Sequence, residues 1–114
     1  MMIEFSDLGN ELRLIKLTGR LDHVGAGEIE GRFAEYCAVN NGRVLVDLSA
    51  VEFLTSFGIR LLVLNAKDVA SRGGRMFLLS PKPGVRHVVE VSGVRTIIPI
   101  YESIDAARAA FLAA

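Results

Sequence analysis

The feature that most constrains the fold of this chain is a change of periodicity between Val44 and Leu64. Val44 to Leu48 is a short, almost unbroken apolar run, as expected for a strand that is covered on both faces in a parallel sheet. After a short loop, the apolar residues that follow Ser56 recur with helical spacing. They are Ile59, Leu62, Val63, Ala66, Val69 and Ala70. A buried strand followed by an amphipathic helix is the repeating unit of α/β proteins, so we expect that class of fold.

The rest of the chain extends this alternation after an opening pair of strands. Residues 2–8 and 11–18 are joined by a short connection, which predicts a β-hairpin. Further strands are expected at residues 44–48, 76–79 and 96–101, and helices at residues 24–39, between Ser56 and Gly73, between Gly84 and Gly93 and after Ser103. Pro99 cannot donate a ladder hydrogen bond, which places the last strand at an edge or a strand end. We predict one α/β domain over residues 1–114, with a mainly parallel mixed sheet of about five strands and about four crossover or terminal helices.

The balance of charge limits the classes of partner. Thirteen basic residues match thirteen acidic residues, so nucleic acid and membrane insertion are not expected. The single Cys37 excludes an internal disulfide framework and Cys/His metal spacings, which suits a reducing, cytoplasmic location. The N-terminus lacks the features of a leader peptide, and the apolar runs are too short to cross a bilayer. A hydrophobic content of 51% leaves apolar surface for a protein partner, and a weak homodimer is left open.

One interpretation of Ser56 is that it is a catalytic nucleophile. Ser56, Asp68 and His87 follow the chain order of the α/β-hydrolase triad, and Gly58 supplies the second glycine of a Gly-x-Ser-x-Gly turn. However, Leu54 stands where the first glycine belongs, and Asp68 is expected well inside the helix that Ser56 begins. The glycine patterns of nucleotide-binding loops are absent as well. We therefore predict a binding protein rather than an enzyme, without a cofactor or a metal site.

The hydroxyl pair Thr55-Ser56 also has a purely structural interpretation. Ser and Thr at a helix start serve as N-caps, in which the side-chain oxygen accepts a hydrogen bond from a free N–H of the first turn. The same position has unpaired N–H groups and the positive end of the helix dipole, which suit a functional anion. The local pattern leaves both interpretations open, and the cap is the simpler.

Four segments together resemble one known family. Residues 47–59 read Asp-Leu-Ser-Ala-Val-Glu-Phe-Leu-Thr-Ser-Phe-Gly-Ile, which resembles the signature of STAS domains of the bacterial anti-sigma factor antagonist type. Residues 17–22 resemble that family's Gly-x-Leu-Asp segment, and Ser92-Gly93-Val94 is similar to its late Ser-Gly-Leu turn. Gly73-Gly74 precedes a strand, as in the family. The resemblance covers nearly the whole chain and implies the STAS fold.

The resemblance implies a phosphorylation switch. In the family, the serine that matches Ser56 is phosphorylated by an anti-sigma factor that is itself a serine kinase. The unmodified domain binds that anti-sigma factor and frees the sigma factor, and the phosphorylated domain releases its partner. Thr55 stands where well-known members often have Asp, so Thr55 is a second candidate acceptor.

The partner interface expected from this resemblance surrounds Ser56. Its residues are Asp22, Phe53, Leu54, Thr55, Phe57 and Gly58. One alternative function is a STAS scaffold or small-ligand-sensing module that is not phosphorylated. A domain associated with an anion transporter is disfavoured, because the chain shows no membrane segment.

Overall fold

Five strands form one mixed sheet in the order β1-β2-β3-β4-β5. The computed structural model describes residues 1–113. The strands are β1 (Met2–Asp7), β2 (Leu12–Leu21), β3 (Arg43–Leu54), β4 (Arg75–Leu79) and β5 (Ile100–Tyr101). β1 and β2 pair antiparallel, and every later neighbour pairs parallel. The predicted fold class, a mainly parallel sheet that opens with a hairpin, is confirmed.

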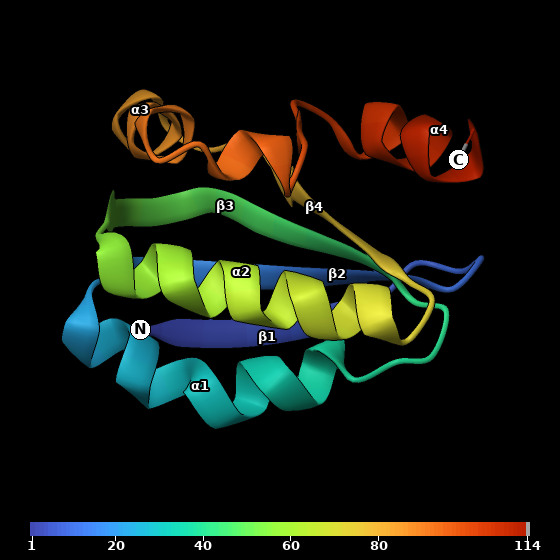
Figure 1. Ribbon diagram of the computed structural model, residues 1–114, viewed down its shortest axis with the longest axis horizontal. Helices are drawn as coiled ribbons and strands as arrows, with labels where there is room; N and C mark the ends of the chain where they lie inside the picture. Colours follow the sequence, from blue (N-terminus) through green and yellow to red (C-terminus); the bar gives the residue numbers. More distant parts are fainter. Residues whose placement is uncertain (114) are drawn as a thin grey trace.

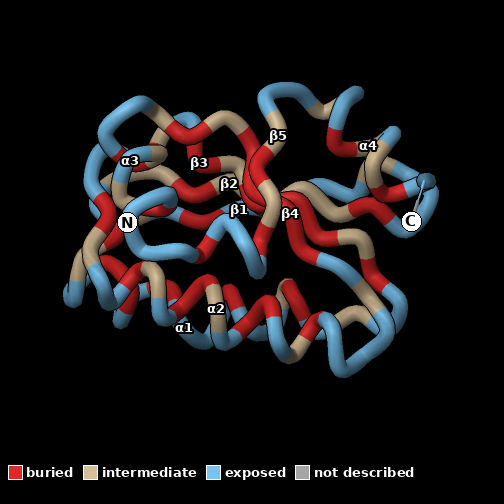
Figure 2. Tube along the Cα trace, turned by 45° about the horizontal axis from the view of Figure 1, so that its top comes forward, coloured by how far each residue is buried: buried red, intermediate tan, exposed pale blue. Residues whose placement is uncertain are grey.

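The helices lie on both sides of this sheet. They are α1 (His23–Cys37), α2 (Ser56–Ser71), α3 (Pro83–Val91), the 3-10 turn η1 (Val94–Thr96) and α4 (Ile104–Ala113). Figure 1 shows α3 and α4 above the strands, and Figure 2 shows α1 and α2 side by side below them. Across residues 1–113, no helix is both long enough and apolar enough to cross a membrane.

Alternating residues of the central strands divide the interior into two cores. Val44 and Val46 of β3 face the larger core, to which α1 contributes Ile29 and Phe33 and α2 contributes Leu62. The smaller core lies under α4 and contains Leu12, Leu45, Phe77, Leu79, Ala107 and Phe111. β3 and β4 are therefore buried on both faces, as the apolar runs predicted. Figure 2 shows this burial as red segments along the strands and along the inner sides of the helices.

β3 is longer than predicted. The expected loop after Leu48 is wrong, because the strand continues to Leu54. β2 continues beside it to Leu21, with register shifts between Lys16 and Thr18 and between Gly19 and Arg20. β4 pairs only with residues up to Asp47, so the second half of β3 has a strand neighbour on one side only. This half-covered stretch carries polar residues, which is why its sequence resembled a loop.

β5 is shorter than predicted. A strand was expected over residues 96–101, but η1 ends at Thr96 and only Ile100–Tyr101 pair with β4. Pro99, which has no N–H, marks the point where the chain joins the sheet edge. Its carbonyl oxygen accepts a hydrogen bond of 2.8 Å from the Leu78 N–H.

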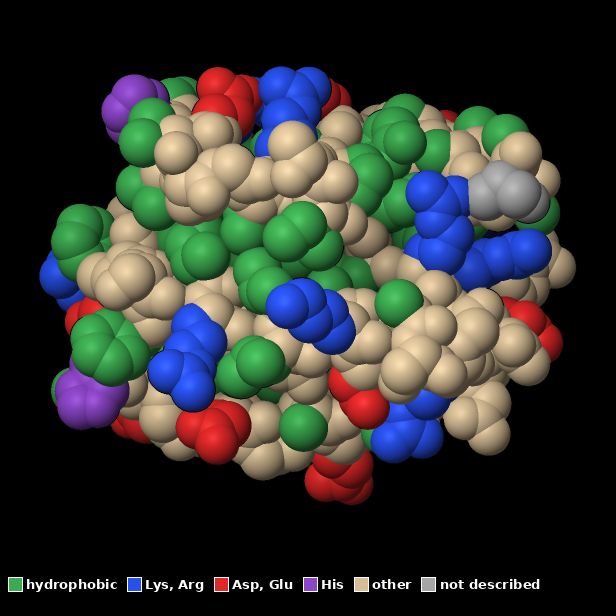
Figure 3. All heavy atoms as spheres, viewed as in Figure 1, with side chains coloured by type: hydrophobic (Ala, Val, Ile, Leu, Met, Phe, Trp, Pro, Cys, Tyr) green, Lys and Arg blue, Asp and Glu red, His purple; other side chains and the backbone are tan. Residues whose placement is uncertain are grey.

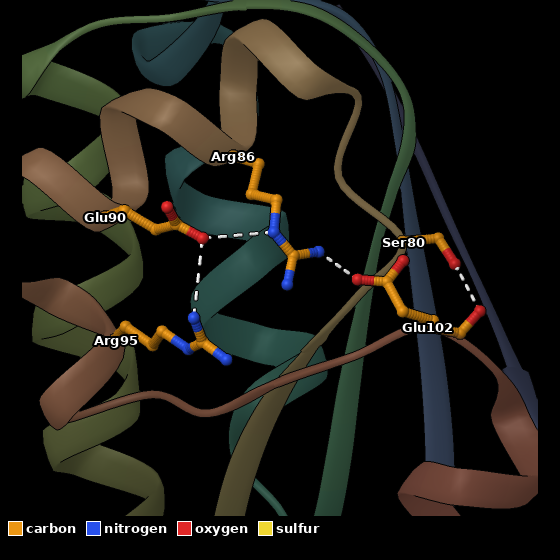
Figure 4. Close-up of polar contacts among 5 residues, drawn as sticks. All are labelled: Ser80, Arg86, Glu90, Arg95 and Glu102. Atoms are coloured by element: carbon orange, nitrogen blue, oxygen red, sulfur yellow. Dashed lines mark hydrogen bonds and ion pairs between the residues drawn. The ribbon is translucent and has the colours of Figure 1, made fainter.

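A series of ion pairs and hydrogen bonds connects α3 to Glu102, the residue that follows β5 (Figure 4). Arg86 Nε donates to Glu90 Oε1 at 3.1 Å, and Arg86 Nη1 donates to Glu102. Arg95 Nη1 donates to the same Glu90 oxygen at 3.4 Å, and Ser80 Oγ donates to the Glu102 carbonyl at 2.7 Å. The hydrogen bond with Glu102 raises the pKa of the Arg86 guanidinium, to which Glu90 also contributes. Side-chain bonds thus supplement the apolar contacts of this short helix.

Candidate functional site

Ser56 is the first residue of α2, and it is exposed. Thr55 occupies the N-cap position, with extended backbone at φ −113° and ψ 178°. Its hydroxyl makes no capping bond and instead donates to the Leu21 carbonyl at 3.4 Å. The expected cap is therefore only half correct, because Thr55 stands at the right place but caps no N–H group. The first-turn N–H groups of α2 have no side-chain acceptor among residues 1–113, which leaves them available to an anion.

Gly58 lets this helix start sit against the end of β2. A Cβ atom at Gly58 would lie 2.6 Å from Leu54 Cδ1 and 2.7 Å from the Leu21 carbonyl oxygen. Real Cβ atoms do not approach other heavy atoms so closely, so a larger residue would push α2 away from Leu21. The Ser-x-Gly spacing thus has a packing cause: the glycine provides the close approach, and the serine two residues earlier remains at the surface.

Asp22 starts α1 in the same way. It is the N-cap residue, and its Oδ1 accepts a hydrogen bond of 2.9 Å from the Gly25 N–H. This bond, together with Arg20 at 3.5 Å, holds the pKa of the Asp22 carboxyl below its usual value. Gly25 is required here, because a Cβ would lie 1.9 Å from the Arg20 carbonyl oxygen. Residues 19–22, which lie between the strand and the helix expected from the sequence, are thus the end of β2 and a helix cap.

The starts of α1 and α2 are neighbours. Leu21 pairs with Leu54 in the sheet, and each strand turns into its helix one residue later. The two N-caps, Asp22 and Thr55, are therefore equivalent positions on adjacent strands, as are His23 and Ser56. Consistent with this, the His23 ring lies 4.5 Å from the ring of Phe57. The structure brings Asp22 and the Ser56 turn to one edge of the sheet, in the arrangement that the family resemblance implied.

Two aromatic side chains are exposed beside Ser56. Phe53 is 44% exposed and Phe57 is 50% exposed, and the Arg20 guanidinium lies 4.5 Å above the Phe53 ring. Leu54, by contrast, is only 3% exposed, and Gly58 is buried. Their assignment to the contact surface needs correction: strand alternation turns Leu54 into the larger core, and Gly58 packs against β2. The exposed part of the predicted set is Phe53 and Phe57, with Asp22 and Thr55 partly exposed.

The comparison with known proteins is consistent with this geometry. Residues 8–107 match the STAS domain family. The chain belongs to this family. The STAS domain is 35% identical over 95 residues to BtrV of Bordetella bronchiseptica, whose name places it among the anti-sigma factor antagonists; the match covers 83% of this chain and 82% of BtrV. It is 28% identical over 97 residues to the anti-sigma F factor antagonist of Lysinibacillus sphaericus, covering 82% and 81% of the two chains.

Solved structures share the fold of this STAS domain. An anti-sigma factor antagonist from Mycobacterium paratuberculosis superposes with a TM-score of 0.85 at 24% identity, covering 96% of this chain and 92% of that one. Unphosphorylated SpoIIAA gives a TM-score of 0.74 at 24% identity, with 92% of each chain covered. Phosphorylated Bacillus SpoIIAA gives a TM-score of 0.69 at 22% identity, covering 96% and 99%. At these identities the likeness concerns the fold.

The residues of the rival hydrolase triad are not brought together in this STAS domain. Asp68 lies twelve positions beyond Ser56 on the same helix, which corresponds to about 18 Å along its axis. Its carboxylate accepts a hydrogen bond of 3.0 Å from Arg72 Nε. His87 lies on α3, on the other side of the sheet from α1 and α2.

Three further residues of the surface were missed by the sequence analysis. Arg20, His23 and Val24 are all exposed and flank Asp22. Arg20 and His23 lie between the strand expected at residues 11–18 and the helix expected at residues 24–39. The Asp-x-x-Gly pattern of residues 22–25 was the available signal, because a cap at Asp22 places His23 in the first turn of α1.

Proposed function

We propose that this STAS domain is an anti-sigma factor antagonist that is switched off by phosphorylation of Ser56. The observation that carries the proposal is an exposed serine at an uncapped helix start, flanked by two half-exposed phenylalanines and the Asp22 carboxylate. The names of BtrV and of the Lysinibacillus relative support the antagonist function. SpoIIAA, which shares the fold, is known in unphosphorylated and phosphorylated forms. The proposed partner is an anti-sigma factor with serine kinase activity, in the cytoplasm.

The fold can accommodate the modification. A phosphoserine carries about −1.5 to −2 charges, which a helix N-terminus with free N–H groups tolerates well. Ser56 is preferred to Thr55 as the acceptor because the Thr55 hydroxyl already donates to the Leu21 carbonyl and is less exposed. Thr55 keeps its role as the second candidate.

The binding surface, in contrast, would not tolerate the modification. A partner that covers Phe53 and Phe57 would have to desolvate a dianion between them, and Asp22 adds a negative charge on the neighbouring strand end. A loss of about 2 to 4 kcal/mol weakens binding by about thirty- to several-hundred-fold. No conformational change is needed for such a switch.

The test is a binding assay with a purified candidate anti-sigma factor kinase. We expect Ser56→Ala to bind at least as tightly as wild type, and Ser56→Asp to bind at least about tenfold more weakly. ATP should release the wild-type domain but not Ser56→Ala, and mass spectrometry should find the phosphate on Ser56. Ser103→Asp is the matched control, because it places a carboxylate at the start of another helix, α4, where Ser103 is the cap.

Full binding by Ser56→Asp, together with no phosphate on Ser56 or Thr55, would disprove the switch. Binding that persists in the presence of ATP and kinase would then favour the alternative function, a STAS module that is not phosphorylated. One observation supports a ligand-sensing form of that alternative. A groove of about 510 Å³ between α1 and α2 is lined by His23, Phe57, Arg60 and Asn65, among others.

A further inference from the structure

The outer edge of β4 is open along its first residues. β5 pairs only with Leu78 and Leu79, so the edge of β4 before Leu78 has no strand neighbour on that side. The hollow beside this edge has a volume of about 310 Å³ and lies between α2 and the segment that follows η1. Its lining includes Ala66, Lys67 and Ala70 of α2, Gly74 to Phe77, and Thr96, Ile97 and Pro99. This hollow, called the β4-edge groove below, lies far from Ser56 along α2.

Met76 leaves a backbone donor and a backbone acceptor unpaired in the β4-edge groove. The Arg75 N–H donates toward β3, to Gly42, whereas the Leu78 N–H donates to the opposite side, to Pro99. Because successive residues of a strand alternate in direction, the N–H and C=O of Met76 point away from β3, as those of Leu78 do. Among residues 1–113, neither group of Met76 has a hydrogen-bond partner.

Pro99 explains why the ladder stops there. The next donor that Met76 C=O would meet along the ladder is the nitrogen of residue 99, and proline has no N–H. Met76 is only 5% exposed, so its backbone groups are largely shielded from bulk water. Buried backbone groups are almost always paired with protein or with water, so the N–H and C=O of Met76 are available to an incoming strand.

The rim of the β4-edge groove is apolar and positively charged. Ile97 is 52% exposed, and the lining contains the cations Lys67 and Arg75 but no carboxylate. In the structure of residues 1–113, neither cation forms an ion pair; the Arg75 guanidinium instead lies 4.8 Å above the Phe77 ring. Figure 3 shows hydrophobic side chains gathered over the middle of this face, with blue basic side chains beside them. Charge complementarity thus favours an acidic occupant.

We infer that the β4-edge groove binds a short, extended, acidic segment of another protein. The backbone of the segment pairs with the N–H and C=O of Met76, which continues the sheet in place of β5. An apolar side chain of the segment packs against Ile97, and a flanking carboxylate meets Lys67 or Arg75. This is strand addition to an open sheet edge, in which backbone bonds provide affinity and side-chain contacts provide specificity.

NMR titration of the ¹⁵N-labelled protein tests the inference with a defined probe. The probe is the acetylated and amidated peptide Glu-Val-Val-Glu, and its counterpart is Lys-Val-Val-Lys. We expect the acidic peptide to shift the Met76 amide proton downfield in a saturable way and to slow its exchange with water. The basic peptide should bind at least about tenfold more weakly. Lys67→Glu combined with Arg75→Glu should reverse this preference, whereas Arg32→Glu on α1 should not.

Ala70→Phe provides a second variant, because Ala70 is exposed and lines the groove. The added ring should block the peptide, whereas Ala109→Phe on α4 should leave binding intact. A Met76 amide that does not respond up to about 10 mM acidic peptide, tenfold above a millimolar Kd, overturns the inference, and only ordered water then fills the groove. Equal shifts with both peptides also overturn it. A response to decanoate without a response to the peptide overturns the inference as well, and it assigns the groove to a small amphiphile.

Discussion

At the scale of single residues, two glycines set how closely the helix starts approach β2. Gly58 lies against Leu21 and Leu54, and Gly25 lies against the carbonyl of Arg20. Gly27, two positions beyond Gly25, has open space where its Cβ would be. Glycines in the same two helices therefore have opposite consequences for stability, because only some of them meet a neighbour.

Gly58→Ala is expected to destabilise the protein. The new methyl group would lie within 2.7 Å of Leu21 atoms, and overpacking of this kind costs about 1–3 kcal/mol. Gly27→Ala is the matched control, and it should stabilise the protein by about 0.5–1 kcal/mol because alanine favours helix and meets no neighbour. Urea denaturation measures both changes. Equal effects of the two substitutions would show that Gly58 is not required by packing.

Asp22 makes a pH-dependent contribution to stability. Its pKa in the folded protein is below the usual value of 3.8, chiefly because the carboxylate accepts the Gly25 N–H. A carboxyl with a lowered pKa stabilises the fold above its unfolded pKa, and this stabilisation is lost as the pH falls through the folded pKa. Asp22→Asn keeps a capping oxygen but removes the charge.

We therefore expect Asp22→Asn to have a lower Tm than wild type at pH 7. The difference should shrink as the pH falls below 3.8 and disappear when the wild-type carboxyl is protonated. Thermal unfolding followed by circular dichroism across this pH range measures it. A Tm difference that does not change with pH would mean that the charge of Asp22 is not the cause.

At the scale of elements, the sequence predicted the kinds of element more reliably than their ends. The apolar run of residues 44–48 identified a central strand because both of its faces are covered. Beyond Leu48, only β2 continues beside β3, so polar residues such as Ser49 and Glu52 reach solvent. The apolar run therefore stops before the strand does. Bulges within this stretch place Leu48, Val51 and Leu54 inward at intervals of three, which breaks the period of two expected of a strand.

The candidate site followed the same pattern. The grouping of Asp22 with the residues around Ser56 was implied by the family resemblance, and the pairing of Leu21 with Leu54 is its structural cause. The exposure of individual side chains could not be predicted. Phe53 and Leu54 are both apolar, and they differ only in the direction in which the strand points their side chains. The missing cap at Thr55 likewise depends on how close Leu21 lies, which is a contact between distant parts of the chain.

α3 depends in part on ion pairs for its attachment. Glu102→Gln removes the carboxylate that accepts a hydrogen bond from the Arg86 guanidinium, so the helix should open locally more often, although Val85 and Val89 still hold it in the larger core. We expect amide hydrogen exchange in residues 86–91 to become several-fold faster, while exchange in β3 stays unchanged. High salt should reduce the difference by screening the wild-type pair. Asp105→Asn, on the exposed first turn of α4, is the control, and an equal effect from it would contradict the role of Glu102.

At the scale of the whole molecule, the two cores are joined because adjacent residues of the same strands enter different cores. Leu45 lies between Val44 and Val46, and Phe77 lies between Met76 and Leu78, so neither core can be lost without disturbing the strand that carries the other. Cys37 offers a probe of the larger core. It is fully buried, and burial raises the pKa of its thiol to about 12, so alkylation requires opening of the structure.

Phe111→Ala tests whether the smaller core is coupled to the larger one. The Phe111 ring is 4% exposed and stacks on Phe77 with ring centroids 4.0 Å apart, so truncation should cost about 3–5 kcal/mol. Because the strands are shared, the same loss should be seen in urea denaturation and in the rate at which iodoacetamide alkylates Cys37, although Cys37 belongs to the other core. Leu112→Ala, at a position 58% exposed, should change either measurement by no more than about 0.5 kcal/mol. If Phe111→Ala left Cys37 alkylation unchanged, α4 would unfold independently, and the two cores would be separate cooperative units.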